Sequence, residues 1–153
     1  MSSLVTFTDR SPRFALPFLL PGQGQKEFFV NEGLARADLL HHCAVSGSAI
    51  TPPSAPVAGE TWRVASGAGG VWSGHDDALA GWQGESWIFV APREGMRIWD
   101  ADAGQFALYR GSWIYSQAPA PVSGGAAQDA ELRNAFAALV TALENAGLFP
   151  SSS

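Results

Sequence analysis

The sequence predicts an α+β fold: an N-terminal helix, a compact antiparallel β-meander or small barrel with repeated aromatic hairpins, and a C-terminal helix after a flexible linker. Three observations predict it. A hairpin-like phrase occurs twice, apolar residues fall at helical spacing in two separate segments, and proline-rich connectors lie between these parts. At 153 residues, the chain is long enough to form one domain with a real core.

The repeated phrase occupies residues 79–89 and returns at residues 106–115. Each copy consists of an apolar run, a short polar turn that contains glycine, and a run of Trp, Ile and an aromatic residue. Aromatic and β-branched residues favour pleated strands, and glycine supplies the positive φ of tight turns. We therefore expect an aromatic-rich antiparallel β-domain over residues 60–117. Its strands are expected at residues 60–65, 78–82, 86–90, 96–99, 105–109 and 112–116.

The segments before and after this β-domain are predicted from their spacing and their helix breakers. Residues 1–24 are expected to form an N-terminal arm, because prolines and glycines recur there. Residues 25–45 are expected to be helical, since Val30, Leu34, Ala37 and Leu40 fall at helical spacing. Residues 46–59 are expected to be a stiff proline-rich linker, and residues 118–128 a second linker rich in Pro, Gly and Ala.

The clearest helical pattern lies at residues 129–149. Asp129 suits the N-cap, and Gly147 suits the left-handed position after the last turn. A lone helix of this length is marginal in water, so we expect it to dock on its own domain or on other copies of the chain. Its opposite face is lined by alanines, which permit close packing. The stripe expected to dock consists of five apolar residues: Leu132, Phe136, Leu139, Val140 and Leu143.

Charge and composition narrow the classes of partner. The net charge is −5 and the pI is about 5.0, which argues against nucleic acid and against an anionic membrane surface. The apolar run at residues 14–20 is too short to span a bilayer, so we expect no membrane insertion. No secretory signal pattern is found, and synthesis in the cytoplasm is expected. Only 15% of the residues are charged, which favours a surface partly covered by other subunits.

No segment carries a complete catalytic, cofactor-binding or metal-binding motif. Residues 22–26 lack the spacing of a phosphate loop. Residues 100–104 lack the later ligands of a calcium loop and are better explained as a turn whose aspartates accept backbone N–H groups. The neighbours His41, His42 and Cys43 diverge on a helix, and His75 has no nucleophile motif beside it. We therefore expect no enzyme activity, no cofactor and no metal.

The aromatic residues of the β-domain allow two interpretations. Exposed indole faces stack on sugar rings, so a repeated set of them suits a carbohydrate platform. Paired aromatics across hairpins are more often the core of a small β-domain or a subunit interface, and this is the interpretation we favour. The candidates for either role are Trp72, Trp82, Trp87, Tyr109 and Trp113.

A resemblance to one family covers nearly the whole chain. It is carried by the runs RFALP at residues 13–17, GQGQKE at 22–27 and NEGLARAD at 31–38, and it continues at residues 72–75, 81–84, 91–95 and 129–135. With these runs the chain resembles a family of domains of unknown function that occur in tail and fibre proteins of phages and in gene transfer agents. Many relatives carry this domain as one segment of a longer protein, whereas here it is almost everything, which suggests a base or adaptor.

The resemblance implies a structural, non-enzymatic component of a phage-like particle. We expect a homo-oligomeric, ring-like base, with five copies the value that suits a capsid vertex, that attaches a spike or fibre to the capsid. Its expected partners are further copies of itself, a capsid vertex protein, a spike fibre protein and capsular polysaccharide. It would be assembled on the head surface and released on lysis. The alternative is a carbohydrate-binding module that recognises cell-surface polysaccharide.

Overall fold

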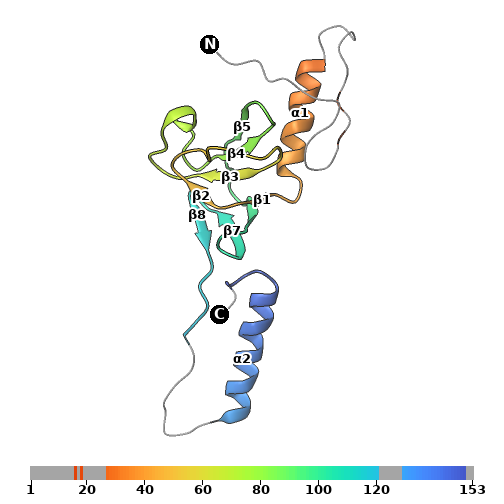
Figure 1. The fold of residues 1–153 in the computed structure, drawn as a ribbon. Helices are drawn as coiled ribbons and strands as arrows, with labels where there is room; N and C mark the ends of the chain where they lie inside the picture. Colours follow the sequence, from red (N-terminus) through yellow and green to blue (C-terminus); the bar gives the residue numbers. More distant parts are fainter. Residues whose placement is uncertain (1–15, 17, 19–26, 121–128, 151–153) are drawn as a thin grey trace.

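The computed structural model describes residues 16, 18, 27–120 and 129–150. Two β-sheets form the body of the protein, with a helix at each end (Figure 1). The predicted α+β class is confirmed. The elements in chain order are α1 (Glu27–Leu40), β1 (Ala44–Val45), β2 (Ser48–Ala49), β3 (Thr61–Val64), the 3₁₀ helix η1 (Gly70–Trp72), β4 (Leu79–Trp82), β5 (Trp87–Val90), β6 (Arg97–Asp100), β7 (Gln105–Tyr109), β8 (Trp113–Tyr115) and α2 (Ala130–Asn145).

The two sheets have the same plan. One has the strand order β1-β6-β7-β8 and the other β2-β3-β4-β5. In each, three consecutive strands form an antiparallel meander, and one two-residue strand adds in parallel at the edge. The antiparallel pairing predicted within residues 60–117 is confirmed, and the two short parallel strands from residues 44–49 make both sheets mixed. Within the described ranges these sheets do not close into a barrel.

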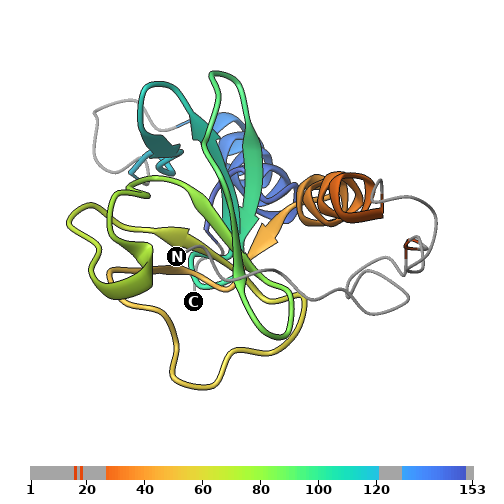
Figure 2. The same cartoon turned by 90° about the horizontal axis from the view of Figure 1, so that it is seen from above.

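The sequence did not predict the two parallel strands, because each is only two residues long. A strand this short shows no alternation of apolar and polar residues. β1 lies where the helix 25–45 was expected to end, and β2 lies inside the expected linker 46–59. Ala44 pairs with Trp99 of one sheet, and Ser48 pairs with Arg63 of the other. Residues 44–49 thus join the two sheets, and Figure 2 shows the chain leading from the end of α1 into β1.

The main core lies between the sheets and the end of α1. It consists of seven buried residues: Leu39, Cys43, Val45, Leu79, Ile98, Ala107 and Trp113. Gly81 lets α1 approach β4 closely, because a Cβ at this position would displace the side chain of buried Leu39. Arg36, also on α1, donates a hydrogen bond of 2.8 Å to the carbonyl of Phe89 on β5. α1 is therefore fixed to the sheet by both packing and polar contacts.

A second core lies between η1 and the β2-β3-β4-β5 sheet. Trp72 is fully buried there with Val64 and Ala80, and its ring meets Trp87 edge to face at a centroid distance of 5.1 Å. η1 begins at the end of the glycine-rich run at residues 67–70. A third, smaller cluster joins Phe18 to Ala35 on α1 and Ile88 on β5. Apart from Leu16 and Phe18, the expected arm 1–24 lies outside the described residues, as do residues 121–128 of the second linker.

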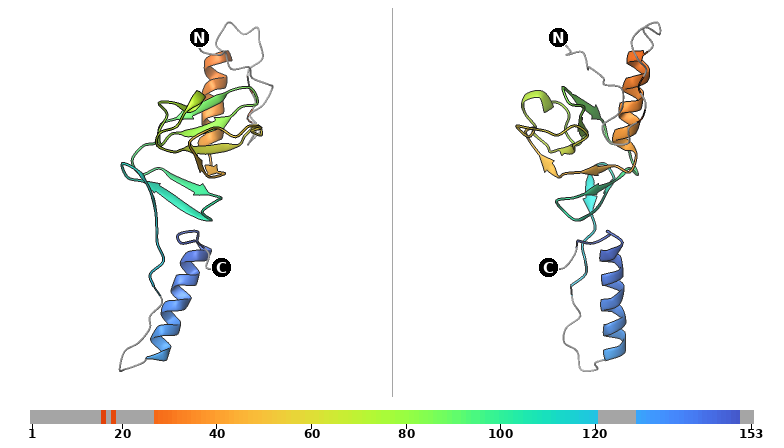
Figure 3. Two further views of the ribbon diagram at one scale, coloured as in Figure 1. Left: turned by 60° about the vertical axis from the view of Figure 1, so that its left-hand side comes forward. Right: turned by 45° about the vertical axis from the view of Figure 1, so that its right-hand side comes forward.

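α2 projects from the body, and the segment just after its C-terminal end, at Gly147, lies against Trp99 and Phe106 (Figure 3). The predicted N-cap is confirmed, since Asp129 Oδ1 accepts from the backbone N–H of Leu132 at 2.9 Å. The predicted C-terminal signal is also confirmed. Gly147 has a φ of 70°, and Leu148 donates its N–H to the carbonyl of Leu143 at 2.9 Å. The Gly147 carbonyl then accepts from the N–H of Phe106 on β7 at 2.7 Å, which anchors this end of the helix.

Candidate functional site

The repeated aromatic residues lie at matching places in the two sheets. Trp82 pairs with Trp87 at the end of the β4–β5 hairpin, and Tyr109 pairs with Trp113 at the end of the β7–β8 hairpin. Trp113 is buried and donates its indole N–H to the carbonyl of Asp77 at 2.9 Å, a contact that ties the two sheets together. Trp72 is fully buried. Neither Trp72 nor Trp113 offers a free face for a sugar ring.

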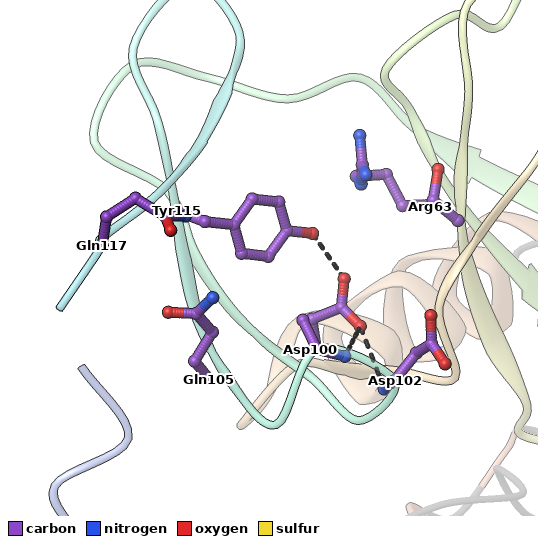
Figure 4. A pocket seen from close by; sticks show the side chains of 8 residues that line it. Arg63, Asp100, Asp102, Gln105, Tyr115 and Gln117 are labelled. Carbon is purple, nitrogen blue, oxygen red and sulfur yellow. Dashed lines mark hydrogen bonds between the residues drawn. The ribbon is translucent and has the colours of Figure 1, made fainter. Parts of the chain in front are cut away.

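An open pocket of about 310 Å³ lies between the sheets at the end where residues 100–105 turn (Figure 4). Strands β2 and β3 line it from one sheet, and strands β6, β7 and β8 line it from the other. Its shape therefore depends on how the two sheets meet. The lining residues are Ser48, Arg63, Asp100, Asp102, Ala103, Gln105, Tyr115 and Gln117.

Asp100 forms the fixed floor of this pocket. It is 97% buried, and its Oδ1 accepts the backbone N–H groups of Asp102 and Ala103, both at 3.1 Å. Its Oδ2 accepts a hydrogen bond from the hydroxyl of Tyr115 (Figure 4). The turn with aspartate accepting backbone N–H groups, predicted for residues 100–104, is thus confirmed. The contact with Tyr115 could not be predicted, because β6 and β8 are joined through β7.

Tyr115 remains protonated over the whole physiological range. Burial, and after it the hydrogen bond to Asp100, raise the pKa of Tyr115 from its ordinary value of 10.0 to about 12. The positive charge of Arg63 acts in the opposite direction, and its guanidinium carbon lies 5.8 Å from the centre of the Tyr115 ring. The phenol therefore acts as a constant hydrogen-bond donor to Asp100.

Arg63 faces Tyr115 from the other sheet. Its backbone N–H is bonded to the carbonyl of Gly47 at 2.9 Å, which fixes the strand position. Its guanidinium interacts with Tyr115, while its Nε is buried without a partner among the residues that the structure describes. An unsatisfied buried donor costs about 1–3 kcal/mol, so this guanidinium is a group that a bound ligand or water would stabilise.

Gln105 links the pocket to the C-terminal segment. It is 95% buried, and with its amide nitrogen turned toward two carbonyls it donates to Ser116 at 3.0 Å and to Leu148 at 3.3 Å. Leu148 directly follows the left-handed Gly147 at the end of α2. The anchoring of α2 and the wall of the pocket therefore share one side chain.

The remaining polar candidates do not form a second site. The ring of His75 stacks on Phe89 with a centroid distance of 3.7 Å and an angle of 4° between the planes. His41 and His42 meet edge to face at 4.5 Å. In the described part of the chain, no three His, Cys, Asp or Glu residues are grouped as metal ligands. Residues 22–26 lie outside the described residues.

The five apolar residues of α2 form a stripe that is only partly covered, since Leu132 and Leu139 are exposed and Phe136, Val140 and Leu143 are half-buried. No residue of this helix is buried, and Leu132 and Leu139 are 67% and 55% exposed. Both residues belong to the stripe that was predicted to dock. Among the helices of the described residues, none is long and apolar enough to cross a membrane.

The sequence analysis identified the stripe and the aromatic pairs but not the polar pocket. Asp100 and Asp102 were noticed only as turn residues. Arg63, Gln105 and Tyr115 carry no local pattern that marks them as neighbours, because they come from three strands in two sheets. The one local indication that Arg63 belongs to the pocket was the alternation of side chains along β3. This alternation places Trp62 and Arg63 on opposite faces of the strand.

Comparison with known proteins gives a family but no function. No curated protein and no solved structure matches the chain. A family model with the description "Protein of unknown function (DUF2793)" matches residues 30–114. This match spans α1 from its fourth residue, both sheets and most of β8, and thus more than half of the chain. The chain therefore belongs to the DUF2793 family of proteins of unknown function.

Proposed function

We propose that this protein is a structural, non-enzymatic subunit that assembles with copies of itself through α2. The observation that carries this proposal is the partly exposed apolar stripe on a helix that projects from the body, in which Leu132 and Leu139 are the exposed members. Leu132 is 67% exposed and Leu139 is 55% exposed, although their spacing places them on one face. The low charge of the chain supports the same proposal, because few charged side chains oppose packing between subunits.

The marginal stability expected of α2 on its own supports this role. α2 has 16 residues, only slightly more than the length of about 12–15 residues below which isolated helices are marginal in water. Its caps at Asp129 and Gly147 contribute, but its own protomer covers none of its residues fully. Burying one leucine side chain contributes about 1.5–3 kcal/mol. Packing two such stripes together would therefore supply the stabilisation that the single chain lacks.

The location of such an assembly is inferred from the resemblance to domains of phage tail and fibre proteins and of gene transfer agents. We propose a ring-like base on the head of a phage-like particle, similar to the head spike base of gene transfer agents. In this role the ring would bind a capsid vertex protein and carry a spike fibre protein, and five copies would match the vertex symmetry. The anchored end of α2 supports this arrangement, since it fixes the direction in which the helix leaves each subunit.

Assembly can be tested by light scattering on the purified chain over a concentration series. We expect an oligomer whose mass does not change with concentration, and a closed ring of five would be the most informative result. Leu139→Glu is expected to reduce it to a monomer, because the change places a charge in the stripe. Asn134→Glu is the matched control, since it adds the same charge on the opposite face of α2, at another exposed position.

Two results would contradict the proposal. One is a wild-type chain that stays monomeric at every concentration. The other is an oligomer that Leu139→Glu and Asn134→Glu leave equally intact, since the stripe would then not be the interface. Electron microscopy of a capsid vertex with the labelled chain would test its location separately from its self-association.

The alternative function, a carbohydrate-binding module, is not favoured by the aromatic residues. Trp72 and Trp113 are buried in the protomer, and Trp82, Trp87 and Tyr109 are half-buried.

A further inference from the structure

We propose that the outer face of α1 receives α2 of the next copy of the chain, so that the subunits join head to tail. This inference rests on the proposed self-assembly through α2 and names the surface that α2 packs against. The outer face is the side of α1 that is turned away from the sheets. It consists of five residues: Phe29, Val30, Gly33, Ala37 and Leu40.

The first argument is the composition of this outer face. All five of its residues are exposed, with Phe29 at 75%, Val30 at 43% and Leu40 at 40%. The opposite side of α1 carries Ala35 and Leu39, which are buried in the body. A surface helix ordinarily presents charged and polar side chains to water. An exposed helix face without a charged residue in it is instead typical of a contact surface.

The exposed side of α2 repeats the spacing of this face. Four residues of the outer face follow one another at intervals of three, four and three: Val30, Gly33, Ala37 and Leu40. Four exposed residues of α2 have the same intervals: Leu132, Ala135, Leu139 and Ala142. Such intervals place each set along one side of its helix, as in the seam between two packed helices. The two helices are also close in length, with 14 residues in α1 and 16 in α2.

The two surfaces complement each other in size. Gly33 and Ala37 keep the middle of the outer face low, and a Cβ built at Gly33 would have nothing within 4 Å. Leu132 and Leu139 project from α2 and are 67% and 55% exposed. Bulky residues set against small ones allow two helices to interdigitate closely. Packing α2 only against α2 of another copy would leave the outer face of α1 uncovered.

Charged residues at the edges of the two surfaces have opposite signs. Arg36 borders the outer face of α1 and Glu131 borders the exposed side of α2, and both are exposed. Arg36 uses one N–H of Nη1 for the carbonyl of Phe89 and one N–H of Nη2 for Glu32. Each of these nitrogens carries a second N–H, with which it can bond an acid of a neighbouring subunit. Such edge contacts favour one partner and one orientation over others.

The positions of the two helices favour contact between different copies. α1 and α2 lie at opposite ends of the body (Figures 1 and 3). α2 of one copy is therefore placed to meet α1 of another copy rather than its own. A contact between two different surfaces is heterologous, and repeated around an axis it closes into a ring. This is the symmetry that the proposed base requires.

The area of the contact favours a ring over an isolated dimer. Five large exposed side chains would be covered: Phe29, Val30, Leu40, Leu132 and Leu139. Covering them would remove on the order of 400 Å² of surface from water. A stable interface between two proteins buries about 1,200–2,000 Å². One contact is thus too small to hold a dimer, whereas in a closed ring every subunit makes two contacts at once.

Cross-linking of the full chain by a short bismaleimide tests which surfaces meet. Ala37→Cys and Ala135→Cys in one chain place a thiol near the middle of each surface, and the single native cysteine, Cys43, is buried. We expect a ladder of covalent oligomers that ends in a closed ring. Ala37→Cys combined with Asn134→Cys is the matched control, since Asn134 is exposed on the opposite side of α2. This control should cross-link about tenfold less, because its thiols have a lower effective concentration.

Ala37→Glu separates this inference from the proposed function. Ala37 is exposed and glutamate is a good helix former, so the variant should fold, which circular dichroism checks. We expect light scattering to show that Ala37→Glu dissociates the oligomer as Leu139→Glu does. An oligomer that Leu139→Glu dissociates and Ala37→Glu leaves intact would overturn the inference and leave the proposed assembly standing.

Two cross-linking results would also overturn the inference. One is a single variant, Ala135→Cys, that cross-links as well as the double variant, since α2 would then pack on α2. The other is equal cross-linking by the double variant and by the Asn134→Cys control. A wild-type chain that stays monomeric at every concentration would remove the proposed assembly and this inference together.

Discussion

Trp82 and Trp87 lie directly opposite each other at the end of the β4–β5 hairpin, with ring centroids 5.1 Å apart and planes at 54°. Tyr109 and Trp113 repeat this relationship at the end of the β7–β8 hairpin, with 5.2 Å and 68°. The turn between the two residues of each pair contains a glycine at positive φ, Gly84 in the first hairpin and Gly111 in the second. The same cross-strand device therefore closes a hairpin in each of the two sheets.

A double-mutant cycle should measure this cross-strand contact. We expect Trp82→Ala and Trp87→Ala to show a coupling free energy of about 0.5–1.5 kcal/mol, the usual value for an aromatic pair. Trp82→Ala combined with Tyr109→Ala is the control, because these residues lie in different sheets, and their effects should add within about 0.5 kcal/mol. Urea unfolding gives each value. Additive effects for Trp82 and Trp87 would show that the facing rings do not stabilise the hairpin.

The close approach of α1 to β4 predicts opposite effects for two glycine substitutions. Gly81→Ala should destabilise the fold by about 1–3 kcal/mol, because its Cβ collides with buried Leu39. Gly33→Ala, in the exposed middle of α1, has no atom within 4 Å of the new Cβ and should stabilise by about 0.5–1 kcal/mol. Thermal unfolding of both variants shows whether each substitution raises or lowers the stability of the fold. Equal shifts would mean that α1 does not pack on Gly81.

The anchor of α2 predicts a second pair of glycine effects. Gly147 and Gly111 have φ values of 70° and 68°, so alanine should cost about 1–2 kcal/mol at either. At Gly147 the new Cβ would also lie 2.5 Å from Cζ3 of Trp99, whereas at Gly111 nothing lies within 4 Å. Gly147→Ala should therefore be the more destabilising variant in thermal unfolding. It should also speed hydrogen exchange at the Phe106 N–H, which bonds the Gly147 carbonyl. Unchanged exchange there would contradict the anchor.

Alkaline pH should weaken the fold through Tyr115. The pKa of Tyr115 is about 12 in the folded protein, raised by burial and by the bond to Asp100, and 10.0 is its ordinary value. Between these values the unfolded chain loses the proton and the folded chain keeps it, so stability is complete below pH 10 and falls as the pH rises toward 12. Urea unfolding at a series of pH values measures this decline.

The assignment to Tyr115 can be checked by phenolate absorbance, because the chain has only two tyrosines. Tyr115→Phe should remove the phenol that titrates near 12 and flatten the alkaline loss of stability. Tyr109→Phe is the control, since the Tyr109 hydroxyl makes no hydrogen bond with the residues described here. If Tyr115→Phe still contained a phenol that titrates near 12, the contact between Tyr115 and Asp100 would be contradicted.

Local patterns determined the elements of this protein. The six longer strands, the two aromatic hairpins, the Asp129 cap and the Gly147 stop were all predicted, because each depends on residues close together in the chain. The stripe on α2 was visible for the same reason, through its helical spacing. What the stripe packs against is a question of partners, and it stays a prediction.

Only the tertiary structure decided how these elements meet. The two-residue strands β1 and β2 exist because Trp99 and Arg63 supply pairing partners from distant segments, and no local pattern marks them. The pocket has the same origin, since Arg63 and Tyr115 lie on strands of different sheets. Spacing along a chain fixes which face a side chain takes within its own element. The relative placement of two sheets follows instead from the burial of their shared core, to which Leu39, Leu79 and Ile98 contribute from three different elements.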